Sequence, residues 1–219
     1  MNSIQPTRLL ITAGATSEPI DEVRYLSNRS SGRLGCLIAL ASATMGYEVT
    51  LLRAISSILP AAHPRLNSIE FTSTRDLSAT LHEYWPSHDV LIMAAAVADF
   101  TPIGGQMRGK LHRDEALSIN FAPTKDIVGS IASETRSDQK IIAFALESNE
   151  ELEMNAKNKL QRKGVDAVIA NPLETMEATT ISAIVYCRDG RSLTPSKNLS
   201  KPAFARWLIA HLQEITASS

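Results

Sequence analysis

A β-α-β unit near the N-terminus restricts the possible folds more than any other feature. Residues 7–13 (TRLLITA) form a continuous apolar and partly β-branched run, which is typical of a strand buried on both faces. Residues 31–45 predict a helix that ends at Gly46, and residues 48–53 predict a second strand. Because such a crossover joins parallel strands, we expect the chain to fold around a mostly parallel sheet.

The rest of the chain continues this alternation of strands and helices. The further predictions are a loose segment 54–73, a helix 75–85 capped by Thr74, a strand 89–96, a mobile flap 100–116, a strand 116–121, a helix capped by Thr124 and ending near 134, a strand 140–146, a helix 149–163, a strand 165–170, a hairpin 181–193 and a helix 198–216. This order predicts an α/β fold: a Rossmann-like, doubly wound, mostly parallel sheet with a C-terminal hairpin and a flap over the site. With no repeat or linker, residues 1–219 are expected to form a single domain.

Composition narrows the classes of partner. The chain has 22 basic and 23 acidic side chains, so no strong field favours nucleic acid or a membrane surface. The apolar run 90–98 is too short to span a bilayer. Cys36 and Cys187 have no metal or redox spacing and are expected in the core, and cysteine poverty fits a cytoplasmic location. The five histidines show no ligand spacing, so no metal site built by the protein alone is expected.

A long polar loop, residues 14–33, joins the first strand to the first helix. Ligands bind at the carboxyl ends of parallel strands, where this loop begins. Ser30, Ser31 and Gly32 directly precede the helix, whose uncapped N–H groups and positive dipole end suit an anion. Arg24, Arg29 and Arg33 add positive charge. The alternative is a plain capping segment with solvated charges.

The same loop carries a family resemblance. The run ITAGATSEPIDEVRYLSNRSSGRLG (11–35) resembles the signature of phosphopantothenate–cysteine ligases. Similar segments follow in the family's order: AAAVADF (94–100), KLHR (110–113), KDIV (125–128), FALES (144–148) and KLQRKGVDAVIAN (159–171). In many bacteria this ligase is the C-terminal half of a fusion with a flavin-dependent decarboxylase. Since the first predicted strand begins close to Met1, a stand-alone ligase without flavin is expected.

The resemblance implies a two-step reaction. The carboxylate of 4′-phosphopantothenate attacks the α-phosphate of a nucleoside triphosphate, which gives an acyl nucleotide and pyrophosphate. The amine of cysteine then displaces the nucleoside monophosphate. Residues 162–171 resemble bacterial members, which generally use CTP rather than ATP. Mg²⁺ is expected to arrive with the nucleotide. Family members are usually homodimers, and the flap is expected to close against a neighbour.

The resemblance also assigns catalytic residues. Asn28 matches the family's catalytic asparagine and is expected to orient the pantothenate moiety and donate to the oxyanion. Arg24 matches a neighbouring arginine that steers a carboxylate; its alternative is a surface ion pair with Asp21 or Glu22. Lys110 is expected to neutralise charge on the α-phosphate. The alternative is that it is an ordinary charged side chain on a solvated loop.

Other matched positions are expected to bind the two phosphorylated substrates. The nucleotide set is Gly14, Ala95, Ala96, Asp99, Lys110, Asp126, Ile127, Phe144, Lys159 and Lys163. The set for the substrate phosphate or carboxylate is Ser30, Ser31, Gly32 and Arg29. The alternative to a binding role is a turn cap for Asp99 and a position in the hydrophobic core for Phe144. The sequence departs from the family at Arg113, where lysine is common, and at Thr124-Lys125, where Asn-Pro is usual.

Two other classes of protein are alternatives to the ligase. An NAD(P)-dependent reductase would share the fold, but the chain has neither G-x-G-x-x-G nor Tyr-x-x-x-Lys. A non-catalytic nucleotide-binding partner of a separate decarboxylase would keep the fold and lose the chemistry. The matched residues Asn28, Asp99, Lys110, Lys159 and Lys163 favour the ligase.

Overall fold

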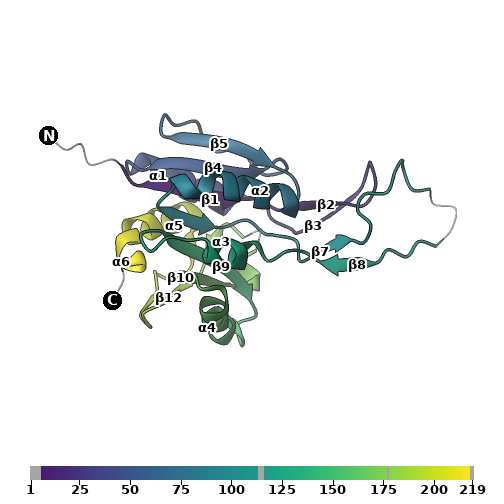
Figure 1. The fold of residues 1–219 in the computed structure, drawn as a ribbon. Coiled ribbons are helices and arrows are strands. Elements are labelled where there is room, and N and C mark those ends of the chain that lie inside the picture. The colour runs from purple at the N-terminus through teal and green to yellow at the C-terminus, as the bar shows by residue number, and fades with distance from the viewer. Residues whose placement is uncertain (1–5, 113–115, 177, 218–219) are drawn as a thin grey trace.

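The structure, a computed structural model, describes residues 6–112, 116–176 and 178–217. Its centre is an eight-stranded sheet (Figure 1). The strands, in spatial order, are β13 (Ser192–Leu193), β12 (Ile184–Cys187), β10 (Ala167–Pro172), β9 (Lys140–Glu147), β6 (Val90–Met93), β1 (Arg8–Ala13), β4 (Glu48–Ala54) and β5 (Leu66–Phe71). The strands from β10 to β5 run parallel, β12 pairs antiparallel with β10, and β13 pairs antiparallel with β12.

The strand order has a switch point in its middle. From β1 the chain moves outward to β4 and β5, and it then returns to β6 and continues the other way through β9 and β10. This is the order of a Rossmann sheet, in which ligands bind where the winding reverses, here between β1 and β6. The predicted α/β class and mostly parallel sheet are confirmed.

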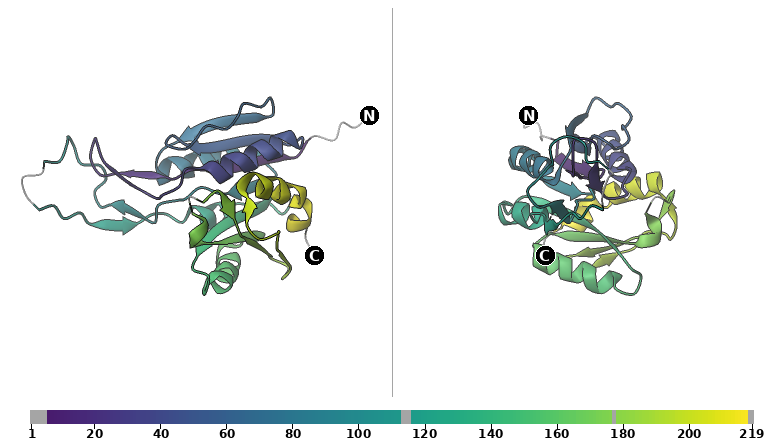
Figure 2. Two further views of the ribbon diagram at one scale, coloured as in Figure 1. Left: turned by 180° about the vertical axis from the view of Figure 1, so that it is seen from behind. Right: turned by 90° about the vertical axis from the view of Figure 1, so that its right-hand side faces the viewer.

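Helices cover both faces of the sheet (Figures 1 and 2). The helices on one face are α1 (Arg33–Thr44), α5 (Lys201–Ala210) and α6 (Leu212–Thr216), and those on the other are α2 (Thr74–Tyr84), α3 (Ile127–Ser133) and α4 (Leu152–Lys163). Two short 3₁₀ turns are η1 (Trp85–Ser87) and η2 (Leu173–Thr175). Leu9 and Ile11 of β1 pack in the core beneath α1, whereas Leu10 packs in the core beneath α2, because successive strand residues point to opposite faces. No helix in the described ranges is both long and apolar enough to cross a membrane.

A two-hairpin projection, which we call the arm, leaves the sheet on the side away from both termini (Figures 1 and 2). Its strands are β2 (Ser17–Pro19) paired with β3 (Tyr25–Ser27), and β7 (Phe100–Pro102) paired with β8 (Phe121–Pro123). The second hairpin comprises most of the predicted flap, so this segment is anchored by strand pairing rather than being a loop throughout. In the rest of the molecule, which we call the body, β11 (Thr180–Ile181) pairs with β14 (Leu199–Ser200) at the start of α5.

The predicted loose segment 54–73 is wrong in part. Strand β5 lies there and pairs in parallel with β4 as the outer strand of the sheet. Its side chains are mostly exposed or half-buried, with only Phe71 buried in the core, so the segment lacks the continuous apolar run that marked the central strands. The predicted strand 116–121 is also shifted, because the pairing in β8 begins at Phe121.

Two predicted helix caps are wrong. The side chain of Ser73, not Thr74, accepts the capping hydrogen bond of α2, from the N–H of Asp76 at 3.1 Å. Helix α3 begins at Ile127 and is capped by Asp126 rather than by Thr124. Thr124 instead donates its hydroxyl to the carbonyl of Ala98 at 2.6 Å. The long C-terminal helix is interrupted at His211, between α5 and α6.

Candidate functional site

A pocket of about 940 Å³ opens at the carboxyl ends of β6 and β9, beside the loop that follows β1. It therefore lies at the switch point, where this class of sheet binds ligands. Its walls are the loop and first turn of α1 (residues 27–35), the segment after β6 (94–100), the start of α3 (123–128), the end of β9 (143–147), Lys159, Lys163, Asn171, Thr175, Met176, Ile181 and Lys201.

Close packing of glycines forms the base of the pocket. Gly14 and Gly32 have φ values of +89° and +72°, which side chains with a Cβ rarely adopt. A Cβ on Gly32 would lie 2.6 Å from the Cβ of Ser57 and 2.9 Å from the backbone nitrogen of Gly14. In α1, a Cβ on Gly35 would lie 2.6 Å from the Cβ of Ala13. The start of α1 is thus seated directly on the end of β1.

The N-terminus of α1 borders the pocket without a side-chain cap. Gly32 is the N-cap residue and has no side chain to accept a hydrogen bond, and the first turn holds no acidic residue. Gly32, Arg33, Leu34 and Gly35 all line the pocket. The backbone N–H groups and the positive end of the helix dipole are therefore suited to an anionic ligand.

The segment after β6 is fixed by hydrogen bonds to residues of the first βα loop. The N–H of Ala96 donates to the carbonyl of Gly14 at 2.8 Å. The N–H of Ala98 donates to the hydroxyl of the fully buried Thr16, also at 2.8 Å. The side-chain amide of Asn28 donates to the carbonyl of Val97 at 3.0 Å, which holds Asn28 against this segment. Such bonds to backbone groups leave the segment little freedom to rearrange.

On the other wall, helix α4 supplies two cations, and a carboxylate lies at the start of α3. Lys159 donates to the carbonyl of Phe144, and burial, with the charge of Lys163, lowers the pKa of Lys159. Lys163 pairs with Asp126, which caps α3 by accepting from the N–H of Gly129. Burial alone would raise the pKa of Asp126, but the hydrogen bonds from Lys163 and Gly129 outweigh it and lower that pKa. Phe144 lines the pocket and is also half-buried against the core, so both expected roles are compatible with its position.

All but three of the predicted site residues line this one pocket. The residues brought together are Asn28, Arg29, Ser30, Ser31, Gly32, Ala95, Ala96, Asp99, Asp126, Ile127, Phe144, Lys159 and Lys163. Gly14 packs against Gly32 and shapes the base from below. Arg24 and Lys110 lie on the arm and are absent from the pocket walls. Arg113, the predicted replacement for a family lysine, lies outside the described residues.

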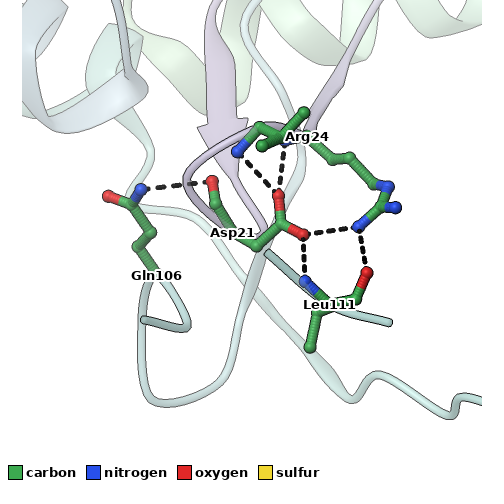
Figure 3. A network of polar contacts seen from close by, with 5 residues as sticks. Asp21, Arg24, Gln106 and Leu111 are labelled. Carbon is green, nitrogen blue, oxygen red and sulfur yellow. Dashed lines mark hydrogen bonds and ion pairs between the residues drawn. The ribbon is translucent and has the colours of Figure 1, made fainter. Parts of the chain in front are cut away.

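Arg24 takes part in a polar network that ties the two hairpins of the arm together (Figure 3). Its guanidinium contacts the carboxylate of Asp21 at 2.6 Å and donates to the carbonyl of Leu111 at 3.2 Å. The carboxylate of Asp21 also accepts from the N–H of Leu111, at 3.0 Å. Gln106 donates to the carbonyl of Asp21 at 3.1 Å. The ion pair considered as the alternative for Arg24 is therefore present.

Several pocket residues come from the C-terminal part of the chain and have no place in the predicted site. They are Asn171, Thr175, Met176, Ile181 and Lys201. Asn171 ends the segment 159–171 that resembles the family, and its amide donates to the hydroxyl of Thr175 at 2.8 Å. Because Asn171 lies in a segment that resembles the family, the sequence could have marked it as a site residue. Lys201 offered no such signal, because it begins a C-terminal helix whose sequence reads as an ordinary core element.

The fold and the pocket define an α/β protein of the Rossmann type, with a ligand pocket at the switch point that is suited to anions. Within this class, the chain belongs to the family of the DNA/pantothenate metabolism flavoprotein C-terminal domain, whose model matches residues 4–215.

Named relatives support the assignment to this family. Over 97% of its length, the chain is 30% identical to a coenzyme A biosynthesis bifunctional protein CoaBC of Vibrio vulnificus, and it covers 53% of that protein. It is 38% identical over 76% of its length to a protein of an unknown prokaryotic organism named cysteine/cysteine sulfinic acid decarboxylase, covering 46% of it. The chain thus spans about half the length of these relatives. The crystal structure of the C-terminal domain of a CoaBC protein has a TM-score of 0.79 and 28% identity, with 98% of each chain covered.

Proposed function

We propose that this chain is a phosphopantothenate–cysteine ligase of coenzyme A biosynthesis. The observation that carries the proposal is the convergence, in one pocket at the switch point, of residues that match this ligase across five separate segments. The similarity to the C-terminal domain of CoaBC supports the same activity. The name of the decarboxylase relative describes a protein of which the chain covers less than half.

The chemistry of the pocket supports an acyl-nucleotide mechanism. Attack of a carboxylate on the α-phosphorus brings two anions together and releases pyrophosphate, so fixed cations and N–H donors lower the barrier. Lys159, Lys163 and the N-terminus of α1 supply them. Asn28, whose side chain is held on the carbonyl of Val97, would orient the acyl group when the amine of cysteine attacks and the nucleoside monophosphate leaves.

The nucleotide is proposed to be CTP accompanied by Mg²⁺. Among the residues that the structure describes, no three His, Cys, Asp or Glu side chains are close enough to form a metal site. The ion would therefore be held mainly by phosphate oxygens and water, with Asp99 as a pocket carboxylate near them, and it would neutralise phosphate charge. The single-domain organisation and a cytoplasmic location stay predictions.

The arm supports a homodimer. Arg24 and Lys110, two of the proposed catalytic residues, are carried on the arm and away from the pocket of their own chain. The arm exposes large apolar side chains, among them Ile103 at 65% and Tyr25 at 58%. Exposed apolar surface of this kind marks interaction sites, and a second copy would bring the arm to a pocket that lacks these two residues.

Release of pyrophosphate tests the proposal. The protein is incubated with 4′-phosphopantothenate, cysteine, Mg²⁺ and each of the four nucleoside triphosphates, beside an Asn28→Ala variant. We expect release that requires phosphopantothenate and is fastest with CTP, and coupled product only when Asn28 is intact. Removing an oxyanion donor lowers kcat by about 10²- to 10³-fold.

Other outcomes separate the alternatives. Folded protein that binds a nucleotide but releases no pyrophosphate would indicate a non-catalytic partner. Oxidation of a reduced nicotinamide cofactor would indicate a reductase. Fastest release with ATP would correct the nucleotide and leave the ligase standing.

A further inference from the structure

Lys201 is a largely buried lysine with no counter-charge. It is the first residue of α5, the residue is only 9% exposed, and it lines the pocket. Within the described ranges its ammonium group makes no hydrogen bond and no ion pair. Burying an unpaired charge costs free energy, so proteins keep such a group where a ligand completes it.

The surroundings of Lys201 are positive. Burial, followed by the charge of Arg33, lowers the pKa of the Lys201 ammonium, and no described carboxylate acts in the opposite direction. Arg33 is the first residue of α1 and lines the same pocket. Two cations and an uncapped helix N-terminus therefore face the same space, an arrangement that favours a group with more than one negative charge.

The position of Lys201 is fixed by the fold. Helix α5 packs against α1, and the first residues of both helices line the same pocket. The pairing of β14 with β11 sets the start of α5, and the N–H of Lys201 donates to the carbonyl of Thr179 at 3.1 Å. A binding group on such a support needs little ordering when a ligand arrives.

The pocket has cations on both sides of the sheet. Arg33 and Lys201 come from α1 and α5 on one face, while Lys159 and Lys163 come from α4 on the other. The end of β6, with Asn28 and residues 94–99, lines the pocket between them. The proposed reaction takes two phosphorylated substrates, so two separate cationic regions match two phosphoryl groups.

We propose that Lys201, together with Arg33 and the N-terminus of α1, binds the terminal phosphate of 4′-phosphopantothenate. This inference rests on the proposed function. It leaves Lys159 and Lys163 for the triphosphate, and it places the substrate carboxylate near Asn28, between the two regions. Lys201 is a binding residue that takes no part in bond making.

Direct binding of each substrate alone tests the assignment without turnover. Calorimetric titration of Lys201→Gln is expected to show 4′-phosphopantothenate binding weakened by about 10- to 100-fold, the usual effect of losing a charge-assisted hydrogen bond. Affinity for CTP should change by less than about twofold, since CTP is bound on the other side of the sheet. Pantothenate, which lacks the phosphate, should bind to both forms equally. Lys201→Arg should restore most of the affinity.

Matched controls distinguish binding from a structural role. Lys197→Gln removes the same charge from an exposed position four residues earlier and should leave both affinities unchanged. Because Lys201 has no partner in the unliganded protein, Lys201→Gln should keep or raise the thermal stability. A lowered melting temperature together with unchanged phosphopantothenate affinity would overturn the assignment, as would a loss of CTP affinity instead. If the wild-type protein binds no phosphopantothenate, the proposed function itself fails.

Discussion

Gly32 shows how single residues set the shape of this pocket. Its left-handed backbone and its contact with Gly14 let the loop turn into α1 while leaving the helix N-terminus uncapped. A serine or aspartate there would cap the helix and would use the N–H groups that an anionic ligand needs. The absence of a side chain is therefore tied to ligand binding as well as to packing.

Replacing Gly32 with alanine is expected to destabilise the protein through two separate terms. The left-handed backbone costs about 1–2 kcal/mol, and the Cβ, placed 2.6 Å from that of Ser57, adds an overpacking cost of about 1–3 kcal/mol. Gly46→Ala is the matched control, because Gly46 has φ +98° and open space around its Cβ. Urea unfolding should show the larger loss for Gly32→Ala, and equal losses would refute the packing argument.

Single residues also mark the limit of what the sequence predicted. Asn28, Asp99 and Lys159 lie in segments that match a family motif, so their place in one pocket could be expected before the fold was known. Lys201 belongs to no such motif and joins the pocket only because α5 packs against α1. Contacts between segments so far apart in the chain leave no local periodicity from which to predict them.

At the scale of elements, the predictions succeeded where burial is uniform. Strands β1, β6 and β9 are continuous apolar runs because both faces are covered. The outer strand β5 is mostly uncovered, so its sequence resembled a loop. The hairpins of the arm were not predicted for a similar reason. They are short and are held by hydrogen bonds between polar groups rather than by an apolar face.

The arm should loosen in acid because of Asp21. The N–H of Leu111, followed by those of Val23 and Arg24 and the guanidinium of Arg24, lowers the pKa of Asp21 from 3.8 to about 2, against the opposing effect of burial. A carboxyl with a lowered folded pKa stabilises fully above its unfolded value, and the effect fades as the pH falls through the folded value. Hydrogen exchange of residues 17–27 should therefore show protection that falls between about pH 4 and pH 2.

Two variants check the origin of that change. Asp21→Asn should show low protection of the arm at every pH, because the amide cannot replace the charged acceptor. Glu22→Gln, at the exposed neighbouring position, should behave like the wild type. The same pH profile in Asp21→Asn and wild type would assign the loosening to another group.

At the scale of the whole molecule, the chain keeps the two parts of its proposed active site apart. The body carries the pocket with Asn28, and the arm carries Arg24 on the network that joins its hairpins (Figure 3). If the arm of one copy serves the pocket of another, each site in a dimer takes residues from both chains. The Asn28 and the Arg24 that serve one site would then come from different subunits of the dimer.

Subunit complementation tests this arrangement directly. Asn28→Ala and Arg24→Ala are each expected to be nearly inactive alone. After mixing and exchange in equal amounts, roughly a quarter of wild-type activity should return, because half of randomly paired dimers are mixed and each mixed dimer has one site with both residues intact. Ile103→Asp, which places a charge on the exposed apolar arm, should weaken dimerisation by sedimentation and abolish the recovery. Activity that never returns from a mixture shown to contain mixed dimers would place Arg24 in the site of its own chain, reached by bending of the arm.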